Sequence, residues 1–163
     1  MSALKVGIEA PAFDLPLLGG GRFSLREALA QSPVVLAFFK VSCPVCQYAF
    51  PLYERLAQKT AERLRVVGVS QDDESASRMF AKTYGVTFPI TLDDTRRYPV
   101  SNAYGLSNVP TIFEIAQNGR IAVSCVGWEK AAVEDIYRNV ANAETSGVLL
   151  FPSSEAIADF RAG

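Results

Sequence analysis

The sequence contains no histidine among its 163 residues, and it has only three cysteines. Without histidine the chain can form neither a Ser-His nor a Cys-His catalytic pair, nor a histidine-ligated metal site. Three cysteines are too few for a Cys₄ zinc site, and they do not form the dense disulfide framework of a small secreted protein. We therefore expect no metal and no cofactor.

The sequence also lacks an excess of charge of either sign and any long hydrophobic run. Lysine and arginine number 16 and aspartate and glutamate 17, so the formal net charge is −1. No basic patch indicates a nucleic-acid partner. No apolar run has the length of a membrane span, and residues 1–5 contain no apolar signal segment. We expect a cytoplasmic protein without a nucleic-acid or membrane partner.

The stretch from residue 34 to residue 60 organises the rest of the chain. Residues 34–40 form a short apolar run, rich in valine and phenylalanine, with the length and composition of a buried strand. After Pro44 the apolar residues recur at helical spacing, at Val45, Ala49, Leu52 and Leu56. Cys43 and Cys46 therefore lie at a junction between a strand and a helix.

This junction favours reactivity at the first cysteine. With Cys43 at the N-cap and Pro44 at the first helical position, the free N–H groups of Val45 and Cys46 point towards the Cys43 sulfur. The helix dipole adds about 0.3–1 kcal/mol for a thiolate. That is too little alone, so the hydrogen bonds must add to it, and the nearby Lys40 could contribute as well. Two such cysteines near a βαβ pattern indicate a redox pair; the alternative is an inert, buried apolar pair.

The remaining patterns predict an α/β fold in one domain over residues 1–163. Its core spans about 6–142 and its tail 143–163. The pattern favours strands at 34–40, 64–70, 88–92, 111–116 and 120–126, and helices at 24–30, 44–60, 74–84, 129–142 and 154–161. A helical turn is expected within 95–104, and Met79 is expected on the apolar side of helix 74–84. The apolar residues 148–152 either pack on the domain or form a partner site.

Three segments carry a resemblance to a known family. They are the motif Cys43–Cys46 (Cys-Pro-Val-Cys), the opening Val6–Pro16 (Val-Gly-Ile-Glu-Ala-Pro-Ala-Phe-Asp-Leu-Pro) and Val109–Thr111 (Val-Pro-Thr). Together they resemble the thioredoxin-like superfamily, in its AhpC/TSA and TlpA-like branch of thiol-disulfide oxidoreductases. The resemblance spans about residues 6–140. It implies a thioredoxin-like fold, a central mixed sheet with helices on both faces, to which this chain adds an N-terminal extension and a short C-terminal helix.

The resemblance also implies a function. Cys43 would attack a disulfide, and Cys46 would resolve the mixed disulfide. A cis Pro110, the backbone of Val109 and Pro44 would bind the substrate; the alternative is an ordinary trans proline at a strand start. The partners would be protein disulfides and an upstream thiol reductant. An uncharged Pro-Val between the cysteines and a reducing compartment favour the reductase direction.

The sequence departs from the family where a proton acceptor is usual. Ala37 stands in place of a buried aspartate in the strand, and Ala49 in place of a glutamate three residues after Cys46. Water, Lys40 or Glu114 would have to take the proton from Cys46. Lys40 has the alternative reading of a solvated lysine, and Glu114 that of a carboxylate on the solvent side or at an edge.

Cys125 and Trp128 each have two alternative roles. Cys125 alternates with Ile121 and Val123, which favours a core position over a third redox thiol. Trp128 either packs in the core or covers the site.

Two other functions compete with disulfide exchange. A peroxiredoxin-like hydroperoxide reductase shares the N-terminal pattern but requires P-x-x-x-[TS]-x-x-C. Counting back from Cys43 gives Lys40 and Leu36, and counting back from Cys46 gives Cys43 and Phe39. Neither register supplies the Thr/Ser or the Pro. The other competitor is a redox-inactive thioredoxin-like binding module.

Overall fold

A five-stranded mixed sheet forms the centre of the computed structural model, which describes residues 2–141 and 147–163. Its strand order is β5-β4-β3-β6-β7, with β3 parallel to β4, β4 parallel to β5, and β6 antiparallel to both β3 and β7. The strands are β3 (Val34–Phe39), β4 (Arg65–Ser70), β5 (Ile90–Leu92), β6 (Thr111–Ile115) and β7 (Ile121–Val126). All six residues of β3 are buried, as expected for a central strand.

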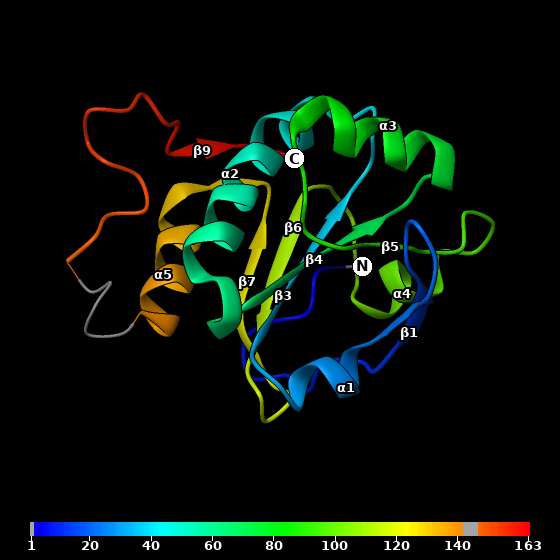
Figure 1. Ribbon diagram of the computed structural model, residues 1–163. Coiled ribbons are helices and arrows are strands. Elements are labelled where there is room, and N and C mark those ends of the chain that lie inside the picture. The colour runs from blue at the N-terminus through cyan, green and yellow to red at the C-terminus, as the bar shows by residue number, and fades with distance from the viewer. Residues whose placement is uncertain (1, 142–146) are drawn as a thin grey trace.

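Helices cover both faces of this sheet (Figure 1). One face packs against α2 (Pro44–Thr60), α3 (Glu74–Tyr84) and α5 (Lys130–Val140). The other packs against α1 (Leu25–Leu29), α4 (Pro99–Ala103) and the N-terminal arm, which contains β1 (Asp14–Pro16) and β2 (Arg22–Ser24). The short helix η1 (Ala61–Arg63) follows α2. This is the α/β thioredoxin-like layout predicted from the sequence.

Capping residues fix the ends of α1 and α3. Ser24 Oγ accepts from the Glu27 N–H at the start of α1, and Asp73 Oδ1 accepts from the Ala76 N–H at the start of α3. Gly85 ends α3 in the left-handed conformation. The prediction for Met79 was wrong: its side chain is 69% exposed, because the buried stripe of α3 follows Ser77 and Phe80.

A bulge in β7 corrects the predicted face of Ile121. Glu114 pairs with Val123, but the next residue of β6, Ile115, pairs with Ile121. The extra residue in β7 reverses the alternation, so Ile121 and Cys125 belong to the hydrophobic clusters on opposite sides of the sheet.

The predicted C-terminal helix over 154–161 is wrong. Residues 147–163, here called the C-terminal strap, contain no helix. Near its end, β9 (Phe160–Arg161) pairs antiparallel with β8 (Trp128–Glu129). The polar groups of the Ala158 backbone bind the side chains of Tyr48 and Trp128 rather than a helical turn. These hydrogen bonds to side chains take the place of the helical backbone hydrogen bonds that the sequence predicted.

The apolar part of the strap lies partly on the domain. Leu150 and Phe151 are buried, while Val148 and Leu149 remain exposed. Within residues 2–141 and 147–163, no helix is both long enough and apolar enough to cross a membrane.

Candidate active site

Cys43 caps the N-terminus of α2, at the carboxyl end of the central strand β3. Its extended backbone ends the loop that follows Phe39, and Pro44 occupies the first helical turn. The Cys46 N–H donates to the Cys43 sulfur across 3.1 Å. Cys43 is partly exposed and Cys46 is completely buried. A partner molecule can therefore contact the Cys43 thiol, whereas the Cys46 thiol is shielded from solvent.

The second element of the site is the loop that leads into β6. The Val109–Pro110 peptide bond is cis. The Cys43 sulfur lies 3.4 Å from the Val109 carbonyl oxygen. Thr111 Oγ1 donates to the Asn108 carbonyl at 2.8 Å, and the Gly127 N–H donates to the Pro110 carbonyl at 2.7 Å. The structure thus brings Cys43, Val109 and Pro110 together, residues that are about 66 positions apart in the chain.

The two thiols of the pair differ in their electrostatic surroundings. Burial raises the pKa of the Cys46 thiol well above its usual range, and its hydrogen bond with the Cys43 side chain raises it further. Cys46 therefore holds its proton while Cys43 is reduced. The Cys43 sulfur is instead partly exposed and receives a backbone N–H at the N-terminus of α2.

Two residues that the sequence analysis did not select fix the loop before Cys43. Asp72 Oδ2 accepts from the Val41 N–H at 2.8 Å, and Gln47 Nε2 donates to the Val41 carbonyl at 2.9 Å. A sequence signal for Asp72 existed. It follows β4, which is parallel to β3, so both carboxyl ends meet at one edge of the sheet.

The side chains of the candidate pKa-tuning residues have partners other than the two sulfurs. Lys40 is exposed, and its Nζ lies 5.9 Å from the centroid of the Tyr98 ring. Glu114 is buried, further along β6, where it accepts from Asn139 Nδ2 of α5 at 2.8 Å. Burial raises the pKa of Glu114, and the bond from Asn139 partly offsets that rise. The solvent-side reading of Glu114 was therefore wrong.

Cys125 and Trp128 are both core residues, as the simpler readings predicted. Cys125 is 4% exposed and its sulfur lies 3.7 Å from Glu129 Oε2. Burial, followed by the Glu129 carboxylate, raises the pKa of Cys125 to about 12. Trp128 is fully buried, and its indole N–H donates to the Ala158 carbonyl at 2.7 Å.

A half-exposed and a buried cysteine one helical turn apart, facing a cis-proline loop on this sheet, define a thiol-disulfide oxidoreductase of thioredoxin-like fold. The family model described as the AhpC/TSA family matches residues 6–124. The chain belongs to the AhpC/TSA family.

Named relatives agree with this class. Thioredoxin-like protein YneN of Bacillus subtilis is 32% identical over 128 residues, covering 76% of this chain and 73% of YneN. Thiol-disulfide oxidoreductase ResA of the same organism is 30% identical over 148 residues, covering 89% of this chain and 81% of ResA. Among solved structures, the thioredoxin domain of a thiol-disulfide oxidoreductase from Bacteroides vulgatus supports the fold alone. It is 20% identical with a TM-score of 0.75, covering 85% of this chain and all of that domain.

Proposed function

We propose that this protein reduces disulfide bonds in partner proteins through Cys43 and Cys46. The Cys43 thiolate attacks one sulfur of the partner disulfide, which forms a mixed disulfide and expels the other partner sulfur as a thiolate. Cys46 then gives up its proton and attacks the Cys43 sulfur. The second partner thiolate leaves, and both partner thiolates take up protons. The Cys43–Cys46 disulfide holds the two-electron oxidation, and an upstream dithiol reductant returns the pair to its reduced form.

The observation that carries this proposal is the placement of the two sulfurs. Cys43 is accessible, receives the Cys46 N–H and lies beside the Val109 carbonyl. An extended segment of a partner protein fits this place, because the Val109 backbone edge adjoins the attacking sulfur. Cys46 is shielded, so its attack on Cys43 is the intramolecular step that releases the partner.

The surroundings of the pair support the reductase direction. A strongly oxidising pair needs extra stabilisation of its reduced form. Here Pro44 and Val45 carry no charge, and the Lys40 ammonium lies by the Tyr98 ring. Pro44, Val45 and Lys40 therefore give the reduced form of the pair no extra stabilisation. This favours a cysteine pair that donates electrons.

The reduction potential of the pair tests this direction. We expect a value at or below roughly −200 mV, in the range of glutaredoxins and thioredoxin. Equilibration with glutathione redox buffers, followed by alkylation and mass analysis, gives the value. Lys40→Ala should leave it within about 10 mV, as should Lys59→Ala, an exposed lysine at the far end of α2. A wild-type value near about −120 mV, that of a strong oxidant, contradicts the proposal.

The residues around the pair give the competing functions less support. Hydroperoxide reduction by a peroxiredoxin needs a Thr or Ser three residues before the cysteine, where this chain has Lys40 or Cys43. Hydrogen peroxide should therefore give little turnover with a thiol reductant. A redox-inactive binding module predicts that the pair never cycles in the same redox buffers.

A further inference from the structure

We propose that the last residues of the C-terminal strap gate the active site by covering the loop edge on which a partner protein must dock. This inference rests on the proposed exchange with protein disulfides. The strap runs along α2 and over Trp128 and ends beside the Val109–Pro110 loop. Its root is residues 147–158, and its tip is residues 159–163.

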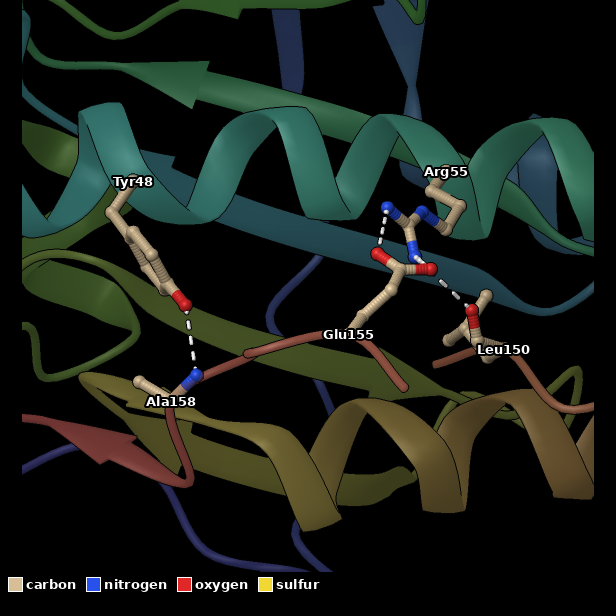
Figure 2. A network of polar contacts seen from close by, with 5 residues as sticks. All are labelled: Tyr48, Arg55, Leu150, Glu155 and Ala158. Atoms are coloured by element: carbon tan, nitrogen blue, oxygen red, sulfur yellow. Dashed lines mark hydrogen bonds and ion pairs between the residues drawn. The ribbon is translucent and has the colours of Figure 1, made fainter. Parts of the chain in front are cut away.

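The root of the strap is held firmly to α2. The Arg55 guanidinium makes two hydrogen bonds to the Glu155 carboxylate, at 3.0 and 2.9 Å, and a third to the Leu150 carbonyl (Figure 2). Tyr48, two turns before Arg55 on the same helix face in Figure 2, accepts from the Ala158 N–H at 2.9 Å through its hydroxyl. Leu150 is buried beneath this network. The root is therefore anchored to the core through Leu150, Arg55 and Tyr48.

The tip lies against the backbone of the active-site loop. Asn108 Nδ2 donates to the Gly163 carbonyl at 3.1 Å. A Cβ added to Gly163 would lie 2.6 Å from the Val109 carbonyl oxygen, and a Cβ added to Gly127 would lie 2.6 Å from the Arg161 carbonyl oxygen. The Val109 carbonyl is the same group that the Cys43 sulfur contacts. A partner joined to Cys43 by a bond of about 2 Å needs the space beside this carbonyl, and the tip occupies it.

The tip is held by contacts that open at little cost. Residues 159–163 are all exposed, and the β8–β9 pairing is two residues long. A pair of strands this short is only marginally stable. Beside this pairing, the Lys130 N–H donates to the Asp159 carbonyl at 2.9 Å, Asn108 holds the Gly163 carbonyl, and the Arg161 guanidinium lies 4.0 Å from the centroid of the Tyr48 ring. Local opening of the tip therefore does not require the root to leave the core.

Two variants loosen the tip without touching the cysteines. Arg161→Ala removes the stacking on Tyr48, and its control is Arg78→Ala, an exposed arginine on α3. Gly127→Ala pushes the tip away through the added Cβ. Its control is Gly119→Ala, which places alanine at a similar positive φ with nothing within 4 Å. Hydrogen exchange of the amides of residues 159–163 reports the opening.

The gate predicts a dependence on the size of the reacting molecule. In Arg161→Ala and Gly127→Ala, a maleimide carried on a bulky polyethylene glycol should label Cys43 about two- to fivefold faster, the factor expected from an exposed cation–π contact. Insulin reduction should accelerate by a similar factor. Labelling by N-ethylmaleimide should stay unchanged in Arg161→Ala, and all three rates should stay unchanged in the controls.

Bulky labelling that is no faster than wild type in both variants overturns the gate. The labelling needs no disulfide exchange, so the two proposals fail separately. Bulky labelling that follows the gate in a protein unable to reduce insulin contradicts the proposed function and supports the gate. Insulin reduction by the wild type, at a rate that the two tip variants leave unchanged, supports the proposed function and contradicts the gate.

Discussion

At the scale of single residues, the two sulfurs of the pair are distinguished by burial and by hydrogen bonds to the backbone. Cys43 accepts the Cys46 N–H at a helix start, whereas burial raises the pKa of Cys46 well above its usual range. Ala37 and Ala49, the positions at which the resemblance implies a carboxylate, are fully buried in the core. In the proposed mechanism we therefore expect Cys46 to lose its proton only after the mixed disulfide has formed.

Alkylation rates test this difference between the thiols. Iodoacetamide at neutral pH should modify Cys43 first, at least about tenfold faster than Cys46 and Cys125, because thiolate and exposure control the rate. At about pH 9 the buried thiols should remain slow, since their pKa values lie higher. Peptide mapping by mass spectrometry gives the order, and urea-unfolded protein is the control in which all three react. Modification of Cys46 before Cys43 contradicts the assignment.

At the scale of elements, α2 does more than carry the pair, because its middle fixes the turn before β5. Glu54 Oε1 accepts from the Thr87 and Phe88 N–H groups at 2.7 and 3.2 Å. Its Oε2 accepts from the Thr87 hydroxyl at 2.5 Å and from Gln58 Nε2 at 2.8 Å. Burial alone would raise the pKa of Glu54, but these hydrogen bonds together lower it.

A pH series tests this carboxylate. A lowered folded pKa stabilises the protein above the unfolded value of the group, and that stabilisation is lost as pH falls through the folded pKa. Glu54→Gln should therefore cost about 1–3 kcal/mol of unfolding free energy at pH 7, and the difference should shrink near pH 3. Urea unfolding at both pH values measures it, with the exposed Glu62→Gln as the control. An equal loss of unfolding free energy at both pH values would show that the charge of the Glu54 carboxylate does not stabilise the fold.

The sequence predicted elements whose signals are local. The apolar run of β3, the Cys43–Pro44 helix start and the Asn118–Gly119 hairpin all depend on neighbouring residues. The bulge in β7 and the non-helical conformation of residues 154–161 depend on partners far away in the chain. Ala158 binds Tyr48 and Trp128, and no propensity of the strap itself encodes those two contacts. The role of Asp72 was missed for the same reason, because its partner Val41 lies 31 positions earlier, in the loop after β3.

At the scale of the whole molecule, the strap ties the end of the described chain to the helix that carries the cysteines. Arg55 is its main connection, through Glu155, the Leu150 carbonyl and the Phe151 ring, whose centroid lies 5.5 Å from the guanidinium carbon. Leu150 and Phe151 are buried, so the contacts of Arg55 with these two residues are worth more than an exposed ion pair, whereas its bonds to the exposed Glu155 add little.

Replacing Arg55 tests how much the strap contributes to stability. Arg55→Ala should lower the unfolding free energy by about 1–3 kcal/mol, because the Glu155 carboxylate and the Leu150 carbonyl lose their donor. Arg138→Ala removes an exposed pair with Asp135 on α5 and should cost less than about 0.5 kcal/mol. Thermal and urea unfolding give both values. Equal effects of the two substitutions show that the strap adds no more than a surface ion pair.

Trapping of the mixed disulfide tests the central claim, that Cys43 attacks disulfides of proteins and Cys46 releases the product. The reduced Cys46→Ser variant is incubated with insulin, and the adduct is mapped by mass spectrometry. The account predicts a stable disulfide between Cys43 and insulin, absent from Cys43→Ser and transient in the wild type. An adduct on Cys125, or no adduct in Cys46→Ser, would contradict it.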